Sequence, residues 1–260
     1  MSFVGIRKVA AATLAFAAIS ALSPTSPASA QTARATMSTA ATGGTAGLTD
    51  LALRYRALEN RLVSQGGLRA DRNARGVGWD QTHLARNFVS IAMFSEYGRG
   101  LSGSPTRGVL RRWTQPVGIS VSFGGSVSQA QRTSDMNKIG SYARQLSQAT
   151  GHPVGLTGGN ANVHVLVVSD AERKGLRPLL NRIAPDLGRS ARNALISAPP
   201  NILCMVVAQP HRDATRGYAR AVVLIRAEHP PRMRTSCIEE ELAQAMGCLL
   251  YTSDAADEDC

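Results

Sequence analysis

The 260-residue chain is poor in aromatic residues, in acidic residues and in long apolar runs. Aromatic side chains make up 5% of it, and 18 acidic residues oppose 29 basic ones, for a formal net charge of +11. The apolar run 9–22 is shorter than the roughly 20 residues of a membrane-spanning helix. Hydrophobic residues still reach 43%. This composition provides a core and excludes a collagen-like, coiled-coil or wholly disordered chain.

The sequence also lacks internal repeats and a phosphate-binding loop, because its Gly-Gly pairs are not followed by the lysine and helix start that such a loop needs. Its 26 arginines are spread along the chain and are not interleaved with aromatics. We therefore expect no nucleic-acid partner. The natural partner is unknown, and the basic charge leaves an anionic component of the cell envelope as a candidate.

Both ends are interpreted as separate from the folded part. Residues 1–30 read as a signal peptide, with Arg7 and Lys8 before the apolar run and cleavage after Ala30. The alternative, an uncleaved anchor, would need a longer run, and no lipid-anchoring cysteine follows. We expect a periplasmic or secreted protein without a transmembrane segment after cleavage. Residues 31–47, mostly small and polar, are expected to form a flexible leader.

Residues 248–260 resemble the translation of a sequencing-library adapter, and they contain acidic residues but no lysine or arginine. A native acidic tail is the alternative. On the adapter interpretation the natural sequence is truncated after Gly247. Excluding residues 1–30 and 248–260 leaves 27 basic and 14 acidic residues, a net charge of +13.

Two cysteines remain outside that tail, Cys204 and Cys237. In an oxidising compartment such a pair predicts one disulfide, whose loop would stabilise the fold by about 3.7 kcal/mol in the chain-entropy model. Metal binding by two thiols so distant in sequence is the less favoured alternative. If the disulfide forms, the Cα atoms should lie about 4.4–6.8 Å apart.

Periodicity predicts a helical N-terminal part over 48–108 and an α+β domain over 109–247. The first part contains helices over 48–62 and from the N-cap Asp80 to about residue 98. The second alternates strands and helices, with strands over 117–123, 161–168, 202–208 and 218–226, a helix capped by Ser134, and a last helix after Cys237. The predicted fold is therefore a single mixed sheet of about four or five strands with packed helices.

Several segments resemble the DUF2927 family of secreted bacterial proteins. The resemblance lies in residues 225–230 and 234–244, and is supported upstream by Arg112-Trp113, residues 150–153 and residues 162–165. It extends over about residues 87–247. The family has no established activity, so the resemblance implies a relative and not a reaction.

Residues 240–247, Glu-Glu-Leu-Ala-Gln-Ala-Met-Gly, are also similar to the zincin helix H-E-x-x-H-x-x-G of zinc metallopeptidases. The similarity places Glu241 at the general-base position and Glu240 and Gln244 at the positions of the two metal-binding histidines. It implies a degenerate, zincin-like domain. Because a glutamine amide is a poor neutral ligand, we expect no cofactor, with a hard divalent metal ion as the alternative. Three glutamates in a first helical turn are also typical of ordinary capping.

Three functions stay open: a non-catalytic zincin-like protein, a metal-dependent hydrolase that uses Glu241 as base, and a basic module for anionic envelope polymers. Glu228 and His229 are candidates for lining the same cleft, although a histidine before proline more often lies on the surface. His164, within an apolar strand, is expected to be a hydrogen-bonded core residue.

Overall fold

The computed structural model describes residues 49–68, 80–95, 106–107, 110–211 and 217–247. The expected signal peptide (1–30), leader (31–47) and foreign tail (248–260) lie outside the described residues and stay predictions. Within the described parts, no helix combines the length and the apolar character needed to cross a bilayer.

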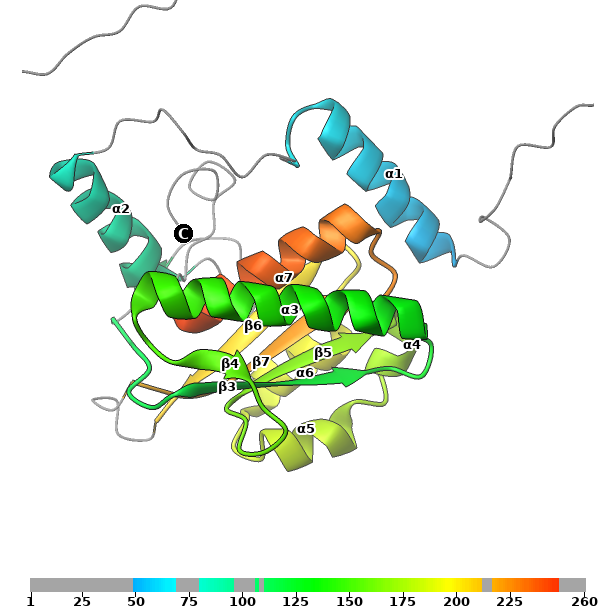
Figure 1. Cartoon of the computed structure of the whole chain (residues 1–260). Coiled ribbons are helices and arrows are strands. Elements are labelled where there is room, and N and C mark those ends of the chain that lie inside the picture. The colour runs from blue at the N-terminus through cyan, green and yellow to red at the C-terminus, as the bar shows by residue number, and fades with distance from the viewer. Residues whose placement is uncertain (1–48, 69–79, 96–105, 108–109, 212–216, 248–260) are drawn as a thin grey trace, which may run out of the picture. The chain divides into compact units, whose positions relative to one another are not determined.

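Five strands form one mixed sheet in the order β4-β3-β5-β7-β6 (Figure 1). The first four run parallel to one another, and β6 pairs antiparallel with β7 at the edge. The strands are β3 Val117–Phe123, β4 Val154–Leu156, β5 Val163–Val168, β6 Cys204–Pro210 and β7 Tyr218–Arg226. This confirms the predicted α+β fold with a single mixed sheet.

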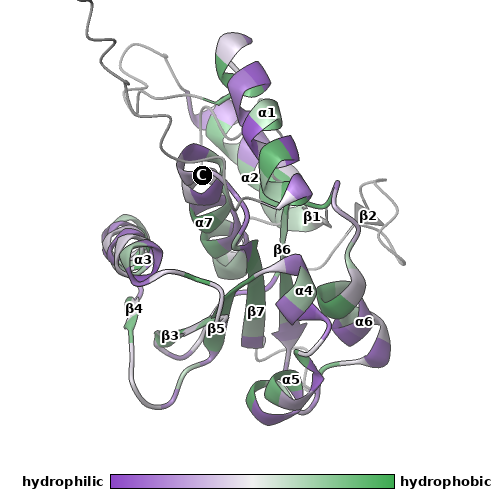
Figure 2. Ribbon diagram, turned by 90° about the vertical axis from the view of Figure 1, so that its right-hand side faces the viewer, coloured by the Kyte–Doolittle hydropathy of each residue, from purple (hydrophilic) through white to green (hydrophobic). Residues whose placement is uncertain are grey.

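Helices cover both faces of the sheet (Figure 2). One face carries α3 and α7, and the other carries the shorter helices α4, α5 and α6. These helices are α3 Gln129–Thr150, α4 Asp170–Arg173, α5 Arg177–Ile183, α6 Arg189–Ser197 and α7 Pro231–Met246. Because both faces are covered, the central strand β5 is buried along its whole length.

Alternate side chains of the central strands enter two separate cores. Val165 of β5 and Val223 of β7 pack beneath α3 and α7, together with Ile238 of α7. Leu166 and Leu224, one residue further along each strand, pack beneath α5 and α6. Successive side chains of a strand point to opposite faces of the sheet, so a strand buried on both faces is apolar at consecutive positions.

Local capping explains most helix starts. Ser128 caps α3 and Gly151 ends it in the left-handed conformation. The prediction that Ser134 begins this helix is wrong, since the helix already begins at Gln129 and Ser134 lies within it. Ser169 and Glu172, three residues apart, form a capping box at the start of α4.

Two further helices and a short ribbon precede the sheet. They are α1 Asp50–Ser64, α2 Gln81–Met93, β1 Phe94–Ser95 and β2 Thr106–Arg107. Asp80 caps α2 as predicted, because its Oδ1 accepts a hydrogen bond from the backbone of His83 (2.8 Å). The helix ends at Met93, five residues before the predicted end.

Helix α7 begins at Pro231, not after Cys237 as predicted. Proline is well suited to the first turn of a helix, where its missing N–H would have no partner within the helix. The correction places Cys237 inside the helix, one turn before Glu240 and Glu241. All three side chains are therefore held on one rigid element.

Candidate functional site

Helix α7 carries the three residues of the degenerate motif and packs against the edge strand β6 and its neighbour β7. Glu241 is 2% exposed and Gln244 is 8% exposed, while Glu240 is half-buried. All three side chains make interactions within the protein. The general-base position is thus enclosed and not presented to solvent.

Two ion pairs hold α7 against α3. Arg234 Nε lies 2.7 Å from Asp135 Oδ1, and both side chains are buried. Lys138 Nζ lies 2.9 Å from Glu239 Oε1 nearer the surface. Burial raises the pKa of Asp135, although the Arg234 hydrogen bond and charge favour its ionised form. Removing Arg234 would therefore leave a buried carboxylate without its cation.

The predicted disulfide is present. Cys204 at the start of β6 is bonded to Cys237 of α7, with the two Cα atoms 5.9 Å apart, within the predicted range. The bond ties the edge strand to the motif helix. It joins residues separated by 33 positions, so it also restricts the unfolded chain.

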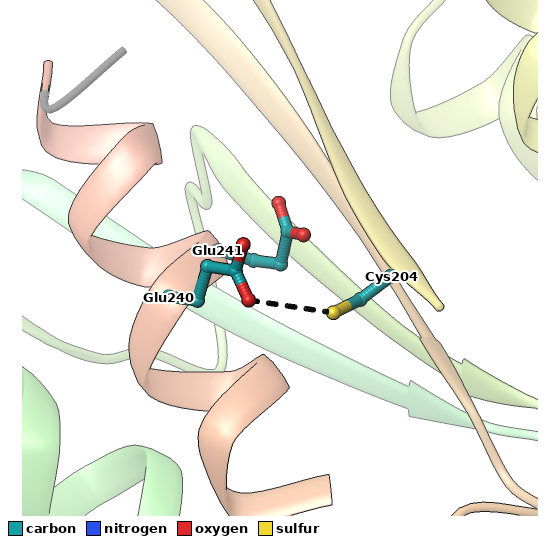
Figure 3. Close-up of side chains that lie close together, drawn as sticks. All are labelled: Cys204, Glu240 and Glu241. Atoms are coloured by element: carbon teal, nitrogen blue, oxygen red, sulfur yellow. Dashed lines mark hydrogen bonds between the residues drawn. The ribbon is translucent and has the colours of Figure 1, made fainter. Parts of the chain in front are cut away.

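Cys204, one half of the disulfide, lies beside the two acidic side chains of the motif (Figure 3). Glu240 Oε2 is 4.0 Å from Cys204 Sγ, and one ligand-capable atom from each of Cys204, Glu240 and Glu241 lies within 4.8 Å of the others. A disulfide sulfur carries neither a proton nor a thiolate charge. While the bond is intact, this group therefore offers a cation the two carboxylates.

The glycine of the motif has the conformation that its residue type favours. Gly247 follows α7 with φ 120°, a value that side-chain-bearing residues rarely adopt. Its amide closes the helix by a hydrogen bond to the carbonyl of Gln244 (3.0 Å).

His229 lies in the turn between β7 and α7 and is 2% exposed. The interpretation that favoured a surface position is wrong, because Tyr55 of α1 packs edge-to-face on its ring with centroids 4.6 Å apart. Burial and the charges of Arg226 and Arg234 lower the pKa of His229 to about 3. The ring is therefore neutral at physiological pH.

Glu228 has a structural contact beside this turn. Its Oε1 accepts a hydrogen bond from the backbone N–H of Asp170 (2.6 Å). Neither Glu228 nor His229 belongs to the group formed by Cys204, Glu240 and Glu241. That they line a shared cleft stays a prediction.

Sequence reasoning missed Arg226, the last residue of β7. It is 1% exposed, and its guanidinium donates to Asp170 Oδ1 (2.9 Å) and to the carbonyls of Ala198, Pro199 and Ile202. One cation thus joins β7 to the start of α4 and to the segment before β6. An arginine that ends an otherwise apolar strand could have indicated a buried, paired side chain.

His164 is the buried core histidine that the sequence predicted. Its Nδ1 lies 2.8 Å from Ser120 Oγ on the neighbouring strand β3. Burial, with a contribution from Arg220, lowers its pKa. It has no contact with the motif carboxylates in the group described above.

A family model described as a protein of unknown function, DUF2927, matches residues 81–255, more than half of the chain. The chain belongs to the DUF2927 family. No curated protein and no solved structure matches the chain. The family match confirms the resemblance inferred from the sequence motifs and assigns no activity.

In this DUF2927 chain the match spans the whole sheet, the disulfide and α7. It also continues past Gly247 into residues 248–255. The family description assigns no chemistry to the motif helix. That geometry is an enclosed pair of carboxylates, a neighbouring amide and a sulfur pair that bridges helix and strand.

Proposed function

We propose that this DUF2927 protein is a secreted or periplasmic protein whose domain is related to zincin metallopeptidases and has no peptidase activity. The observation that carries the proposal is the placement of Glu240, Glu241 and Gln244 on a buried helix against the antiparallel edge strand. This is the motif helix at which the resemblance implies a metal centre, with its two imidazoles exchanged for a carboxylate and an amide.

The order of elements supports the relationship to zincins. Strand β3, helix α3 and strands β4 and β5 precede the antiparallel edge strand β6. Strand β7 follows, and the motif helix α7 comes last. The motif glycine, Gly247, ends this helix at a positive φ. These features are independent of the identity of the side chains at positions 240 and 244.

The loss of catalysis follows from the side chains themselves. The two histidines of the zincin helix, whose neutral imidazoles bind zinc well, are replaced here by Glu240 and Gln244. Of these, Gln244 supplies only a neutral amide oxygen. Glu241 is 2% exposed, so a water molecule on a substrate-binding surface is out of its reach. The disulfide further fixes α7 to β6.

The test is metal analysis of the purified, oxidised protein combined with a general peptidase assay. We expect less than one tenth of an equivalent of zinc and no hydrolysis above the buffer rate. Stoichiometric zinc together with peptide hydrolysis would overturn the proposal. Secretion is tested by expression with a reporter fused after residue 47, which should appear outside the cytoplasm in a form shortened by residues 1–30.

A metal-dependent hydrolase is the second candidate, favoured by the closeness of the carboxylates of Glu240 and Glu241 to each other. In that case Glu241 would act as the base, and Glu240 and Gln244 would bind a hard cation such as Ca²⁺ or Mn²⁺. Glu241→Gln should then abolish turnover without changing the fold. Glu239→Gln is the matched control. Glu239 directly precedes Glu240 on the same helix but pairs with Lys138, so this variant should retain activity.

The net charge of +13 over residues 31–247 supports a role on an anionic envelope polymer. Such binding should weaken steeply with added salt, because exposed charges are screened within about 10 Å at 0.1 M. Retention on an anionic polysaccharide matrix at several salt concentrations is the measurement. Salt-independent retention would remove the electrostatic argument.

A further inference from the structure

We propose that the Cys204–Cys237 disulfide masks a zinc site: after reduction, the two thiolates and the carboxylates of Glu240 and Glu241 together bind one Zn²⁺. The proposal goes beyond the proposed function, since its donor set excludes Gln244 and its metal holds the fold together without catalysing a reaction. It also applies to the reduced protein, whereas the proposed function describes the oxidised one.

The four donors come from two elements that the structure already places in contact. Cys237, Glu240 and Glu241 lie three and four residues apart on α7, and so share one face of the helix. Cys204 lies opposite them at the start of β6, with its Cα 5.9 Å from that of Cys237. A site that joins a strand to a helix in this way needs no rearrangement of the backbone topology.

The spacing of the donor atoms is close to what zinc requires. Three of the four donors, the ligand atoms of Cys204, Glu240 and Glu241, lie within 4.8 Å of one another, and the fourth, Cys237 Sγ, is bonded to Cys204 Sγ in the oxidised protein. In a tetrahedral site with zinc–oxygen and zinc–sulfur bonds of ordinary length, neighbouring ligand atoms are about 3.3–3.8 Å apart. Rotation about side-chain bonds is enough to close the remaining difference of at most about 1.5 Å.

The donor types favour zinc over harder cations. Thiolates are soft ligands that select zinc, whereas Ca²⁺ and Mg²⁺ bind oxygen ligands in larger numbers. Two thiolates and two carboxylates carry the same formal charge as the four thiolates of common structural zinc sites. In the oxidised protein the sulfurs have no thiolate charge, and two carboxylates alone are a weak site.

The switching step is an ordinary thiol–disulfide exchange with a dithiol reductant. Cys204 is half-buried and Cys237 is 3% exposed, so the thiolate of the reductant attacks Cys204 Sγ. The protein S–S bond breaks, and Cys237 leaves as the thiolate. The second thiol of the reductant then releases Cys204 and closes the reductant's own disulfide. Zinc binding displaces the remaining thiol protons into solution.

The experiment measures Zn²⁺ affinity of the full chain before and after reduction, by competition with a chromophoric zinc indicator. Cys248 and Cys260 are replaced by serine throughout, so that two thiols remain. A trialkylphosphine is the reductant, because dithiols themselves bind zinc. It becomes the phosphine oxide, with oxygen taken from water. We expect one equivalent of zinc to bind at least 100-fold more tightly after reduction.

Variants separate a built site from zinc captured by exposed thiols. Glu240→Gln should weaken zinc binding of the reduced protein at least tenfold, and Cys204→Ser should abolish tight binding. Glu239→Gln, whose side chain pairs with Lys138, should leave the affinity within twofold. Co²⁺ should give the sulfur-to-metal charge-transfer absorption of two thiolates.

Two results would overturn the proposal. One is the absence of tight zinc binding in a reduced protein that circular dichroism shows to be folded. The other is equal affinity of the Glu240→Gln variant and the parent, since zinc bound by the thiols of an unfolded chain would not depend on that carboxylate. Neither result bears on the metal content or inactivity of the oxidised protein, so the two proposals fail separately.

Discussion

Glu172 offers the sharpest test of how the carboxyl ends of the parallel strands are held together. Its carboxylate accepts four hydrogen bonds, from the backbone and hydroxyl of Ser126 (2.7 and 2.8 Å) and from those of Ser169 (both 2.9 Å). Ser126 follows β3 and Ser169 follows β5. One side chain thus joins two loops that lie 43 residues apart, from 126 to 169.

The contribution of Glu172 to the free energy of unfolding follows from the pKa of its carboxyl group. Partial burial disfavours the charged form, but the hydrogen bonds from Ser169 and Ser126 outweigh it and lower the pKa from 4.5 to about 2. Such a shift corresponds to at most about 3.4 kcal/mol. Because the group is partly exposed to solvent, we expect Glu172→Gln to reduce the free energy of unfolding at pH 7 by about 1–2 kcal/mol.

The stabilisation by Glu172 should depend on pH. A carboxyl group with a lowered pKa stabilises the fold fully above pH 4.5, and the effect disappears as the pH falls from 4.5 toward 2. Urea unfolding of the parent and of Glu172→Gln, followed by circular dichroism, should therefore give curves that differ at pH 7 and converge at low pH. A difference that is constant across this range would refute the reasoning.

Gly124 provides an independent route to the same interaction. A Cβ atom at this position would collide with the Glu172 carboxylate, whereas one at Gly125 would lie 3.7 Å from its nearest oxygen. We expect Gly124→Ala to destabilise the fold by displacing Glu172, and Gly125→Ala to change stability by less than about 0.5 kcal/mol. The combination of Gly124→Ala with Glu172→Gln should cost less than the sum of the two.

Three further predictions concern other buried groups. Arg226→Lys keeps the charge but loses the planar guanidinium that reaches Asp170 and three carbonyls. Denaturant unfolding should therefore show a free energy of unfolding lower by about 2–4 kcal/mol. Arg232→Lys, at an exposed position, is the control and should leave the stability unchanged. Replacing both Cys204 and Cys237 by serine should cost about 3–4 kcal/mol, given the 33-residue separation; an unchanged midpoint would contradict this account. The pKa of His229, lowered from 6.5 to about 3, makes stability fall as the pH drops through that range, because the unfolded state takes up the proton first. His229→Leu should flatten this part of the stability profile, and a profile identical to the parent's would show that His229 does not titrate as described.

The sequence by itself determined the features that depend on neighbouring residues. The strands Val117–Phe123 and Tyr218–Arg226 follow from the alternation of apolar side chains, and the capping box at Ser169 and Glu172 follows from a three-residue spacing. The disulfide followed from counting, because two cysteines outside the tail leave one pairing. The single mixed sheet was predicted from the same alternation of strands and helices.

Tertiary structure decided what depends on residues far apart in the chain. The antiparallel edge position of β6 and the burial of His229 beneath Tyr55 arise from packing between segments that no local pattern connects. The same holds for the approach of Cys204 to Glu240 and Glu241, and for the contacts of Arg226 with the start of α4 and the segment before β6. A side chain's spacing in sequence indicates which face of its own element it occupies, but its solvent exposure and its charge depend on which other elements pack against that face.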